Sequence, residues 1–312
     1  MLPPAVPTGI SVVIPTHNRR RLLLATLDSL AAQTLPEDRF EVIVGIDGLD
    51  DGTADSLPNH PLSPGLRWTQ LEHRGSGAAR NAAARLARHD VIVFLDDDQQ
   101  ASPELLAVHL ERQRERPLLV QGIYPTAPAY ATGGIALLYD RTIRQSLDAM
   151  ATGQAPFRLW GGNFSVPRET WAAVGGFDES FLRSQDTDFG LSVMKAGVPM
   201  VIEPRAVSLH LYQCRWDAFQ RQMFEEGRSV VRLVEKHGLQ ADLPSASAGR
   251  LDVVLRTAWR RAPAAMDAVG RLAAVGLRTA DRLPVTAAQI AAARVVRRFY
   301  RVGGMSVEAR PR

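Results

Sequence analysis

Short apolar runs alternate with segments of helical periodicity in the first third of the chain. Unbroken runs of this kind are typical of strands buried on both faces, as in a parallel sheet. Their alternation with helices predicts a doubly wound α/β sheet. The expected strands are Ile10–Ile14, stopped by Pro15, then Glu41–Ile46, Leu66–Leu71 and Val91–Leu95, with helices over Arg19–Gln33 and Gly77–His89.

From about residue 101 strands and helices follow one another less regularly, which predicts mixed pairing and a wall for a second substrate. After Trp216 the pattern is helical. We therefore expect an α/β domain over 1–215, with halves at about 9–100 and 101–215, and a helical extension over 216–312. The expected helices of the second half are Ser102–Arg116, Ile135–Ala151, Arg168–Val174 and Gln185–Gly197, and its strands are Leu118–Gly122, Trp160–Val166 and Val198–Glu203.

Three consecutive carboxylates follow the buried strand that ends at Leu95. Adjacent anions such as Asp96, Asp97 and Asp98 raise one another's pKa, and a bound cation keeps them ionised. Oxygen ligands favour Mg²⁺ or Mn²⁺ over zinc. A solvated acidic loop is the alternative interpretation. Because doubly wound sheets bind ligands at the carboxyl ends of their strands, we expect one crevice to be lined by residues 15–18, Asp47, Arg74 and 96–98.

The composition is that of a globular protein with a single cysteine, Cys214. One cysteine excludes an internal disulfide and a cysteine-based zinc cluster, and it fits a reducing compartment. The first residues lack the features of a signal peptide, and no apolar stretch is long enough to span a bilayer. We expect a cytoplasmic protein or one at the inner face of the membrane.

Basic residues are concentrated at the carboxyl end. Residues 250–312 hold 13 arginines against four acidic residues, while the first 249 residues carry a net charge of about −5. Arg256, Arg260 and Arg261 flank an expected apolar helix face that includes Leu251, Val254, Leu255, Ala258 and Trp259. This end could contact an anionic membrane, cap the α/β domain or form a homodimer. Nucleic-acid binding is not expected, because no aromatic residues are interleaved. Residues Pro244–Gly249 are a candidate linker.

Gly75, Gly77 and Arg80 nearly reproduce the glycine fingerprint of dinucleotide-binding folds. Arg80 stands where a third glycine would allow close packing of helix and strand. The motif also follows a later strand instead of the first. A nicotinamide or flavin cofactor is therefore not expected.

A series of short motifs resembles those of family 2 glycosyltransferases, which have the GT-A fold. The resemblance covers residues 9–212 and implies a Rossmann-like, mostly parallel sheet flanked by helices, with a mixed acceptor-side half. The motifs are Val13–Asn18, Ile46–Gly48 with Asp51–Thr53, Arg74–Gly75, Arg80–Asn81, Phe94–Asp98, Gly161–Ser165, Val174–Glu179, Gln185–Asp186 and His210.

The resemblance implies an inverting enzyme of the hexosyltransferase type that uses a nucleotide-sugar, with uridine or thymidine as the expected base. Thr16 and Asp47 would contact the base, Arg80 the nucleotide and Asp96 the ribose. Asp98 and His210 would hold Mn²⁺ or Mg²⁺ at the diphosphate; without the resemblance, His210 would be read as an ordinary histidine. His17 is assigned to the turn. The complete expected nucleotide-sugar set is Pro15, Thr16, Asn18, Asp47, Arg74, Arg80, Asp96 and Asp97.

Asp186 is the candidate general base that takes the proton of the acceptor hydroxyl. The family has Glu then Asp at this motif, whereas this chain has Gln185 before Asp186. Helix capping is the alternative role for Asp186 and for Asp188. Trp160 would pack on a sugar face or in the core. The expected acceptor-side residues are Trp160, Gly162, Asn163, Gln185 and Asp188.

The acceptor would be a sugar, a lipid-linked molecule or a small molecule, in cell-envelope polysaccharide, glycolipid or secondary-metabolite glycosylation. Two other functions are compatible with the aspartates. A metal-dependent nucleotidyltransferase or phosphohydrolase would use the same carboxylates, and a non-catalytic nucleotide-sugar-binding protein would not need Asp186.

Overall fold

The computed structural model describes residues 6–48, 51–239 and 250–309 and divides the chain into two compact units. The first unit comprises Met1–Ala127, Gln145–Phe181 and Gln185–Leu211, and the second comprises Pro128–Arg144, Leu182–Ser184 and Tyr212–Arg312. The single boundary expected near residue 215 therefore omits the segment Pro128–Arg144, which groups with the helical unit. The candidate linker at Pro244–Gly249 lies outside the described residues.

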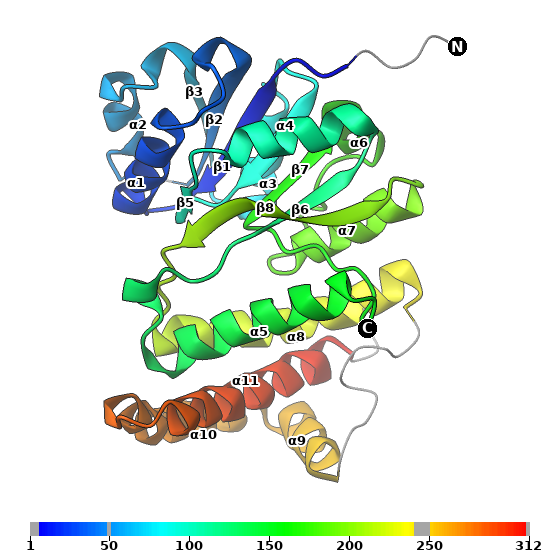
Figure 1. The fold of residues 1–312 in the computed structure, drawn as a ribbon. Helices are drawn as coiled ribbons and strands as arrows, with labels where there is room; N and C mark the ends of the chain where they lie inside the picture. Colours follow the sequence, from blue (N-terminus) through cyan, green and yellow to red (C-terminus); the bar gives the residue numbers. More distant parts are fainter. Residues whose placement is uncertain (1–5, 49–50, 240–249, 310–312) are drawn as a thin grey trace. The chain divides into compact units, whose positions relative to one another are not determined.

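The first unit is built on an eight-stranded sheet in the order β3-β2-β1-β4-β7-β6-β8-β5 (Figure 1). Strands β1 to β4 are parallel, β7 runs antiparallel to both β4 and β6, and β5 pairs antiparallel with β8. The α/β class with a mixed second half is confirmed. The strands are β1 Ile10–Thr16, β2 Phe40–Asp47, β3 Leu66–Leu71, β4 Val91–Leu95, β5 Gln99–Ala101, β6 Leu119–Ile123, β7 Asn163–Pro167 and β8 Met200–His210.

Helices cover both faces of the sheet because alternate residues of its central strands point to opposite sides. In β4, Val91 and Val93 enter one apolar cluster with leucines of α1 and α4, whereas Ile92 and Phe94 enter another with side chains from α3, α6 and α7. All five residues of β4 are buried, as predicted for a central parallel strand. The helices are α1 Arg20–Ala31, α2 Thr53–Ser56, α3 Ser76–Ala84, α4 Leu105–Glu115, α6 Arg168–Ala173 and α7 Gln185–Lys195.

Several boundaries differ from those expected. Strand β1 continues through Pro15 to Thr16, because its pairing with β4 ends at Val13 and only β2 flanks the proline. Helix α3 ends at Ala84 instead of His89. Strand β8 extends to His210 rather than stopping at Glu203. The last difference matters most, because it places His210 in the sheet.

The second unit is helical and has its own core. Helices α8 and α11 approach closely where glycines meet backbone: a Cβ added to Gly304 would lie 1.9 Å from the carbonyl oxygen of Phe224. Trp259 is buried in this core, so the expected apolar face of its helix is divided, with Leu251 and Val254 exposed. The helices are residues 133–144 of α5 (Gly133–Ala151), α8 Trp216–His237, α9 Arg250–Arg261, α10 Pro263–Leu277 and α11 Thr286–Glu308. Among the described helices, none combines the length and apolarity required to traverse a bilayer.

Candidate active site

The carboxyl ends of β1, β2 and β4 lie at one edge of the sheet because these neighbouring strands are parallel. Thr16 ends β1, Asp47 ends β2, and the three aspartates follow β4. The Thr16 hydroxyl donates a hydrogen bond to Asp97 Oδ2 over 2.8 Å. The structure thus brings these predicted residues together, while their roles toward a ligand remain predictions.

Each of the three aspartates has a basic partner within the chain. Arg80 pairs with Asp96, and His210 Nε2 lies 3.1 Å from Asp98 Oδ1. Arg19 bridges the other two carboxylates: its Nη1 lies 2.8 Å from Asp97 Oδ1 and 2.9 Å from Asp98 Oδ2. All three carboxylates are therefore paired, and those of Asp97 and Asp98 are also buried, which contradicts the reading of residues 96–98 as a solvated loop.

Burial and these partners give the aspartates different proton affinities. Burial raises the pKa of Asp97 to about 7, although the Arg19 charge opposes the change. Burial also raises the pKa of Asp96 against the effect of Arg80. At Asp98 burial acts in the same direction, but the charge and hydrogen bond of His210, with Arg19, lower the pKa. Asp98 is thus the aspartate best suited to carry a negative charge.

Arg19 is a site residue that the sequence analysis missed. It was read only as the start of the first helix, but it directly precedes α1 and points at the neighbouring strand end. Its charge is held by Asp97 and Asp98, which raise its pKa although burial opposes this. The available signal was its position one turn after the first parallel strand, at the edge where the aspartates were expected.

His210 reaches the aspartates because of how β8 pairs. The antiparallel ladder between β5 and β8 sets Gln99 opposite His210, and the amide of Leu211 donates to the carbonyl of Asp98 over 2.8 Å. The amide of His210 donates to the carbonyl of Pro125. Backbone pairing on both sides therefore fixes the predicted metal pair.

The pair Asp98 and His210 fits a divalent cation. Adjacent ligands of an octahedral ion with bonds of 2.0–2.1 Å lie about 3 Å apart. The separation of 3.1 Å between Asp98 Oδ1 and His210 Nε2 matches this spacing. The carboxylate of Asp98 is also a ligand that suits Mn²⁺ and Mg²⁺.

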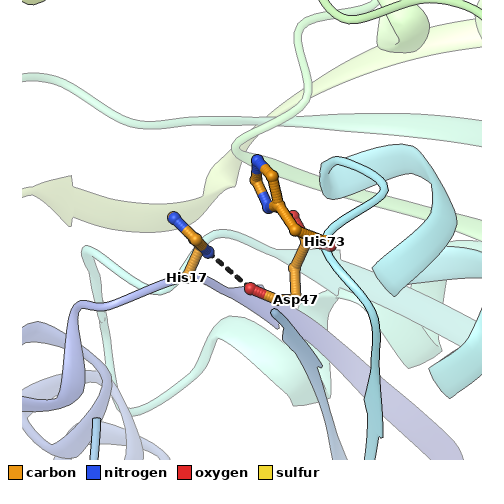
Figure 2. A group of neighbouring side chains, drawn as sticks. All are labelled: His17, Asp47 and His73. Carbon is orange, nitrogen blue, oxygen red and sulfur yellow. Dashed lines mark hydrogen bonds and ion pairs between the residues drawn. The ribbon is translucent and has the colours of Figure 1, made fainter. Parts of the chain in front are cut away.

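Asp47 is held by the chain that follows β3. Its carboxylate accepts hydrogen bonds from the backbone amides of Arg74, over 2.7 Å, and Gly75, over 3.0 Å, and lies 2.9 Å from His73 Nδ1. His17 bonds the carbonyl of Asp47, and Figure 2 shows both histidines beside this residue. Arg74 thus reaches the site through its backbone, because its side chain pairs with Glu179.

The other donor-side residues occupy distinct settings. Arg80 is buried, and its guanidinium lies 5.5 Å from the centroid of the Phe177 ring. Pro15 lies within β1. Asn18 is exposed with a left-handed backbone, φ 52°, and its side chain contacts His17.

Asp186 lies near the start of α7 and contacts the loop before β7. Its Oδ2 accepts from the amide of Gly161 over 2.7 Å, and its Oδ1 accepts from the amide of Thr187 over 2.8 Å. A Cβ at Gly161 would lie 3.2 Å from Asp186 Oδ2, so the glycine permits this approach. One oxygen of the carboxylate thus contacts the first turn of α7, and the other contacts the motif at Gly161.

The remaining acceptor-side residues divide into two groups. Trp160 is half-buried, with the Arg158 guanidinium 5.1 Å from its ring centroid, and Gln185 bonds the Ser76 hydroxyl. Asp188 and Asn163 are buried. The Asn163 amide bonds His109 and the carbonyl of Ala206, so it connects neighbouring elements of the sheet, and its acceptor role stays a prediction.

Tyr124 is a second residue that the sequence analysis missed. It is buried, and its ring meets the His210 ring edge-on with centroids 6.0 Å apart. Burial, with the charge of Asp186, raises the pKa of its hydroxyl well above the ordinary value. A Cβ on Gly162 would lie 3.2 Å from this ring, so the small residue at 162 makes room for Tyr124. Nothing in the apolar pattern around residue 124 marked it.

A mostly parallel sheet with an aspartate triplet after β4 and a mixed half beside it defines a GT-A type fold. A mannosyltransferase from Pyrobaculum calidifontis, solved in complex with GDP-Man and Mn²⁺, superposes with a TM-score of 0.60 at 21% identity, covering 94% of this chain and 87% of that one. Residues 11–160 match the family model of glycosyl transferase family 2, so this part of the chain is a family 2 glycosyltransferase domain.

The chain is also similar to proteins that are named glycosyltransferases. The validoxylamine A glucosyltransferase of Streptomyces hygroscopicus subsp. limoneus is 29% identical over 223 residues, which cover 62% of this chain and 49% of the relative. The poly(ribitol-phosphate) β-N-acetylglucosaminyltransferase TarS of Staphylococcus aureus is 31% identical over 116 residues, 36% of this chain and 20% of the relative. The match thus spans about half the length of the first relative and less of the second.

Proposed function

We propose that this protein transfers a sugar from a nucleotide-sugar to an acceptor hydroxyl with inversion at the anomeric carbon. The observation that carries the proposal is the 3.1 Å pair of Asp98 and His210 in a family 2 domain, beside the paired Asp96 and Arg80. A hexose linked to UDP or dTDP is the proposed donor. Cell-envelope polysaccharide, glycolipid or a secondary metabolite is the proposed setting.

The donor nucleotide would lie along the ends of β1, β2 and β4. Thr16 and the backbone-held carboxylate of Asp47 would contact the base, and Asp96 with Arg80 would orient the ribose and nucleotide. Pro15, Asn18 and the backbone at Arg74 would complete this wall. Asp97 would orient Thr16 and Arg19, because each of these side chains donates a hydrogen bond to one of its carboxylate oxygens.

Asp98 and His210 would hold Mn²⁺ or Mg²⁺. When bound, such an ion would neutralise charge that develops on the departing diphosphate. Arg19 contacts the other oxygen of Asp98, Oδ2, so Oδ1 beside His210 is the oxygen that would face the ion.

Asp186 would accept the proton of the acceptor hydroxyl as the oxygen attacks the anomeric carbon. A single displacement inverts the configuration and requires no enzymic nucleophile. The amides of Gly161 and Thr187 orient this carboxylate. Trp160, which is half-buried, would contact the acceptor beside it, whereas the burial of Gln185, Asp188 and Asn163 favours supporting roles.

The proposal is tested by incubating the purified chain with UDP-, dTDP- and GDP-linked hexoses and Mn²⁺. Slow release of nucleoside diphosphate and free sugar from one donor class is the expected result. Release of inorganic phosphate or pyrophosphate would instead indicate a phosphohydrolase or nucleotidyltransferase. Donor binding without any turnover would indicate a nucleotide-sugar-binding protein.

We also propose that the second unit contacts an anionic membrane surface, which suits a lipid-linked acceptor. Helices α9 and α10 expose apolar side chains near arginines, and Leu272 is 74% exposed. Trp259 takes no part, because it is buried. A homodimer contact through the same surface is the alternative.

A further inference from the structure

A second group of metal-binding side chains, made of residues other than Asp98 and His210, lies where β2 ends. His17, Asp47 and His73 each offer a ligand atom, and these atoms all lie within 4.8 Å of one another. Figure 2 shows the three side chains converging from the ends of β1 and β2 and from the segment after β3. We propose that this group binds Zn²⁺ or a similar transition-metal ion.

The donor set matches this class of metal. Two imidazoles and one carboxylate, with a fourth position left for water, form a common zinc coordination sphere. Imidazole ligands favour zinc, nickel and copper, whereas Mg²⁺ prefers oxygen ligands throughout. The group His17, Asp47 and His73 is therefore expected to select a different ion from the one used at the diphosphate.

Asp47 gives the site one fixed ligand. Asp47 is only 3% exposed, and the backbone amides of Arg74 and Gly75 donate hydrogen bonds to its carboxylate. The fixed carboxylate loses little conformational entropy when an ion binds. It also stays oriented toward His73, whose Nδ1 is 2.9 Å away.

The two histidines supply adjustable ligands. Both are exposed, and their ring centroids lie 4.4 Å apart. Ligands of a tetrahedral ion with bonds of about 2.1 Å are separated by about 3.4 Å, so rotation of the rings completes the geometry. Gly48 lies beside both rings with a left-handed backbone, φ 99°, a conformation that favours glycine.

The metal is tested on the full chain with Co²⁺, whose visible absorption reports coordination by nitrogen, in excess Mg²⁺. One equivalent of Co²⁺, displaced by Zn²⁺, is expected for the wild type. His73→Gln and His17→Gln should each weaken binding about tenfold or more. His237→Gln, in the second unit, and Asp98→Asn should leave this affinity unchanged. Absence of Co²⁺ and Zn²⁺ binding, or equal affinity in the His73 variant, overturns the proposal.

A consequence rests on the proposed function: an ion on Asp47 would exclude the nucleotide base. In excess Mg²⁺, stoichiometric Zn²⁺ should then raise the Kd for UDP in the wild type and have little effect in His73→Gln. Undiminished UDP binding by the zinc-loaded wild type overturns the competition. A chain that binds Zn²⁺ but never UDP would contradict the proposed donor and leave the metal site standing.

Discussion

Two buried carboxylates, those of Asp97 and Asp98, share the guanidinium of Arg19. Removing one partner from an enclosed charge cluster costs several kcal/mol when the group is fully buried, and less here because the Arg19 side chain is 36% exposed. We expect Arg19→Gln to lower the free energy of unfolding by about 2 kcal/mol in EDTA. Added Mn²⁺ should restore more stability in this variant than in the wild type.

Thermal unfolding with EDTA and with Mn²⁺ checks this expectation. Arg21→Gln is the control, because Arg21 is exposed on the same helix. If Mn²⁺ stabilises the Arg19 and Arg21 variants by the same amount, Arg19 does not neutralise the carboxylates of Asp97 and Asp98.

Asp186→Asn keeps the size of the side chain and removes its basicity. We expect turnover to fall by about 10²–10⁴-fold, with the Kd for donor nearly unchanged, because the carboxylate would act on the acceptor proton. Steady-state rates and donor titration separate the two quantities. Glu169→Gln, which removes an exposed carboxylate from the first turn of α6, should retain activity. Near-normal turnover in Asp186→Asn would exclude the residue as the base.

His109 is fully buried between Asn163 Oδ1 and the Ser165 hydroxyl, each 2.9 Å from a ring nitrogen. Burial lowers its pKa to about 4 from 6.5. Between pH 6.5 and pH 4 the unfolded chain binds the extra proton, so His109 should cost stability as the pH falls, by about 3 kcal/mol in total. Urea unfolding should show that the free energy of unfolding falls more steeply between pH 6.5 and pH 4 in the wild type than in His109→Gln. The same pH dependence in both proteins would contradict this role of His109.

The sequence predicts a site residue when a local pattern, such as a polar residue directly after a buried strand, marks its position. The aspartates after β4 and Asp47 after β2 are of this kind, and the structure gathers them at one edge. Arg19 and Tyr124 were missed because their partners are distant in sequence. The glycines beside Asn163 predict access to a ligand, and nothing in the sequence predicts the hydrogen bond that its amide donates to the carbonyl of Ala206.

At the scale of elements, β8 shows where periodicity stops being informative. Its sequence contains Pro204 and Arg205, which break an apolar pattern, yet the strand continues to His210. Pairing with β6, across a register shift at Gly122, and then with β5 sustains it. Strand formation here depends on neighbouring strands more than on local preference, which is why the sequence predicted a shorter strand.

Helices α8 and α11 owe their close contact to Gly304. In Gly304→Ala the new Cβ would fall 1.9 Å from the Phe224 carbonyl, so the helices must separate, at a cost of about 2 kcal/mol or more. Gly276→Ala is the matched control, because a Cβ there meets nothing within 4 Å and alanine favours the helix by about 0.5–1 kcal/mol. Chemical denaturation should show a lower free energy of unfolding for Gly304→Ala and a higher one for Gly276→Ala than for the wild type. Equal free energies of unfolding in the two variants would contradict the close contact at Gly304.

Across the whole molecule, the sequence predicted the sheet of the first unit and the helices after Trp216, but not the grouping of Pro128–Arg144 with those helices. Alternating strands and helices predict a parallel sheet from local patterns alone. The grouping of Pro128–Arg144 with the later helices depends on contacts such as the hydrogen bond from the Gly134 amide to Asp281, 2.7 Å long. Such distant partners leave no periodic signal.

The exposed apolar residues of α10 provide a test of membrane contact by the whole chain. Leu272 and Val275 are 74% and 60% exposed. Introducing Glu at both should weaken sedimentation with anionic vesicles by about tenfold, because apolar burial and charge both change. Val6→Glu, which alters an exposed residue of the first unit, is the control. Equal sedimentation of wild type and double variant would exclude this surface, and dissociation of a dimer by the same variant would favour the homodimer.

The ladder between β5 and β8 has a consequence for synthesis of the chain. A ribosome exposes the aspartates long before it exposes His210, which stands opposite Gln99 only once β8 has formed. A nascent polypeptide that ends before β8 would thus hold the three acids without their histidine. The pair of Asp98 and His210 would then form late in translation, after nearly the whole first unit has emerged.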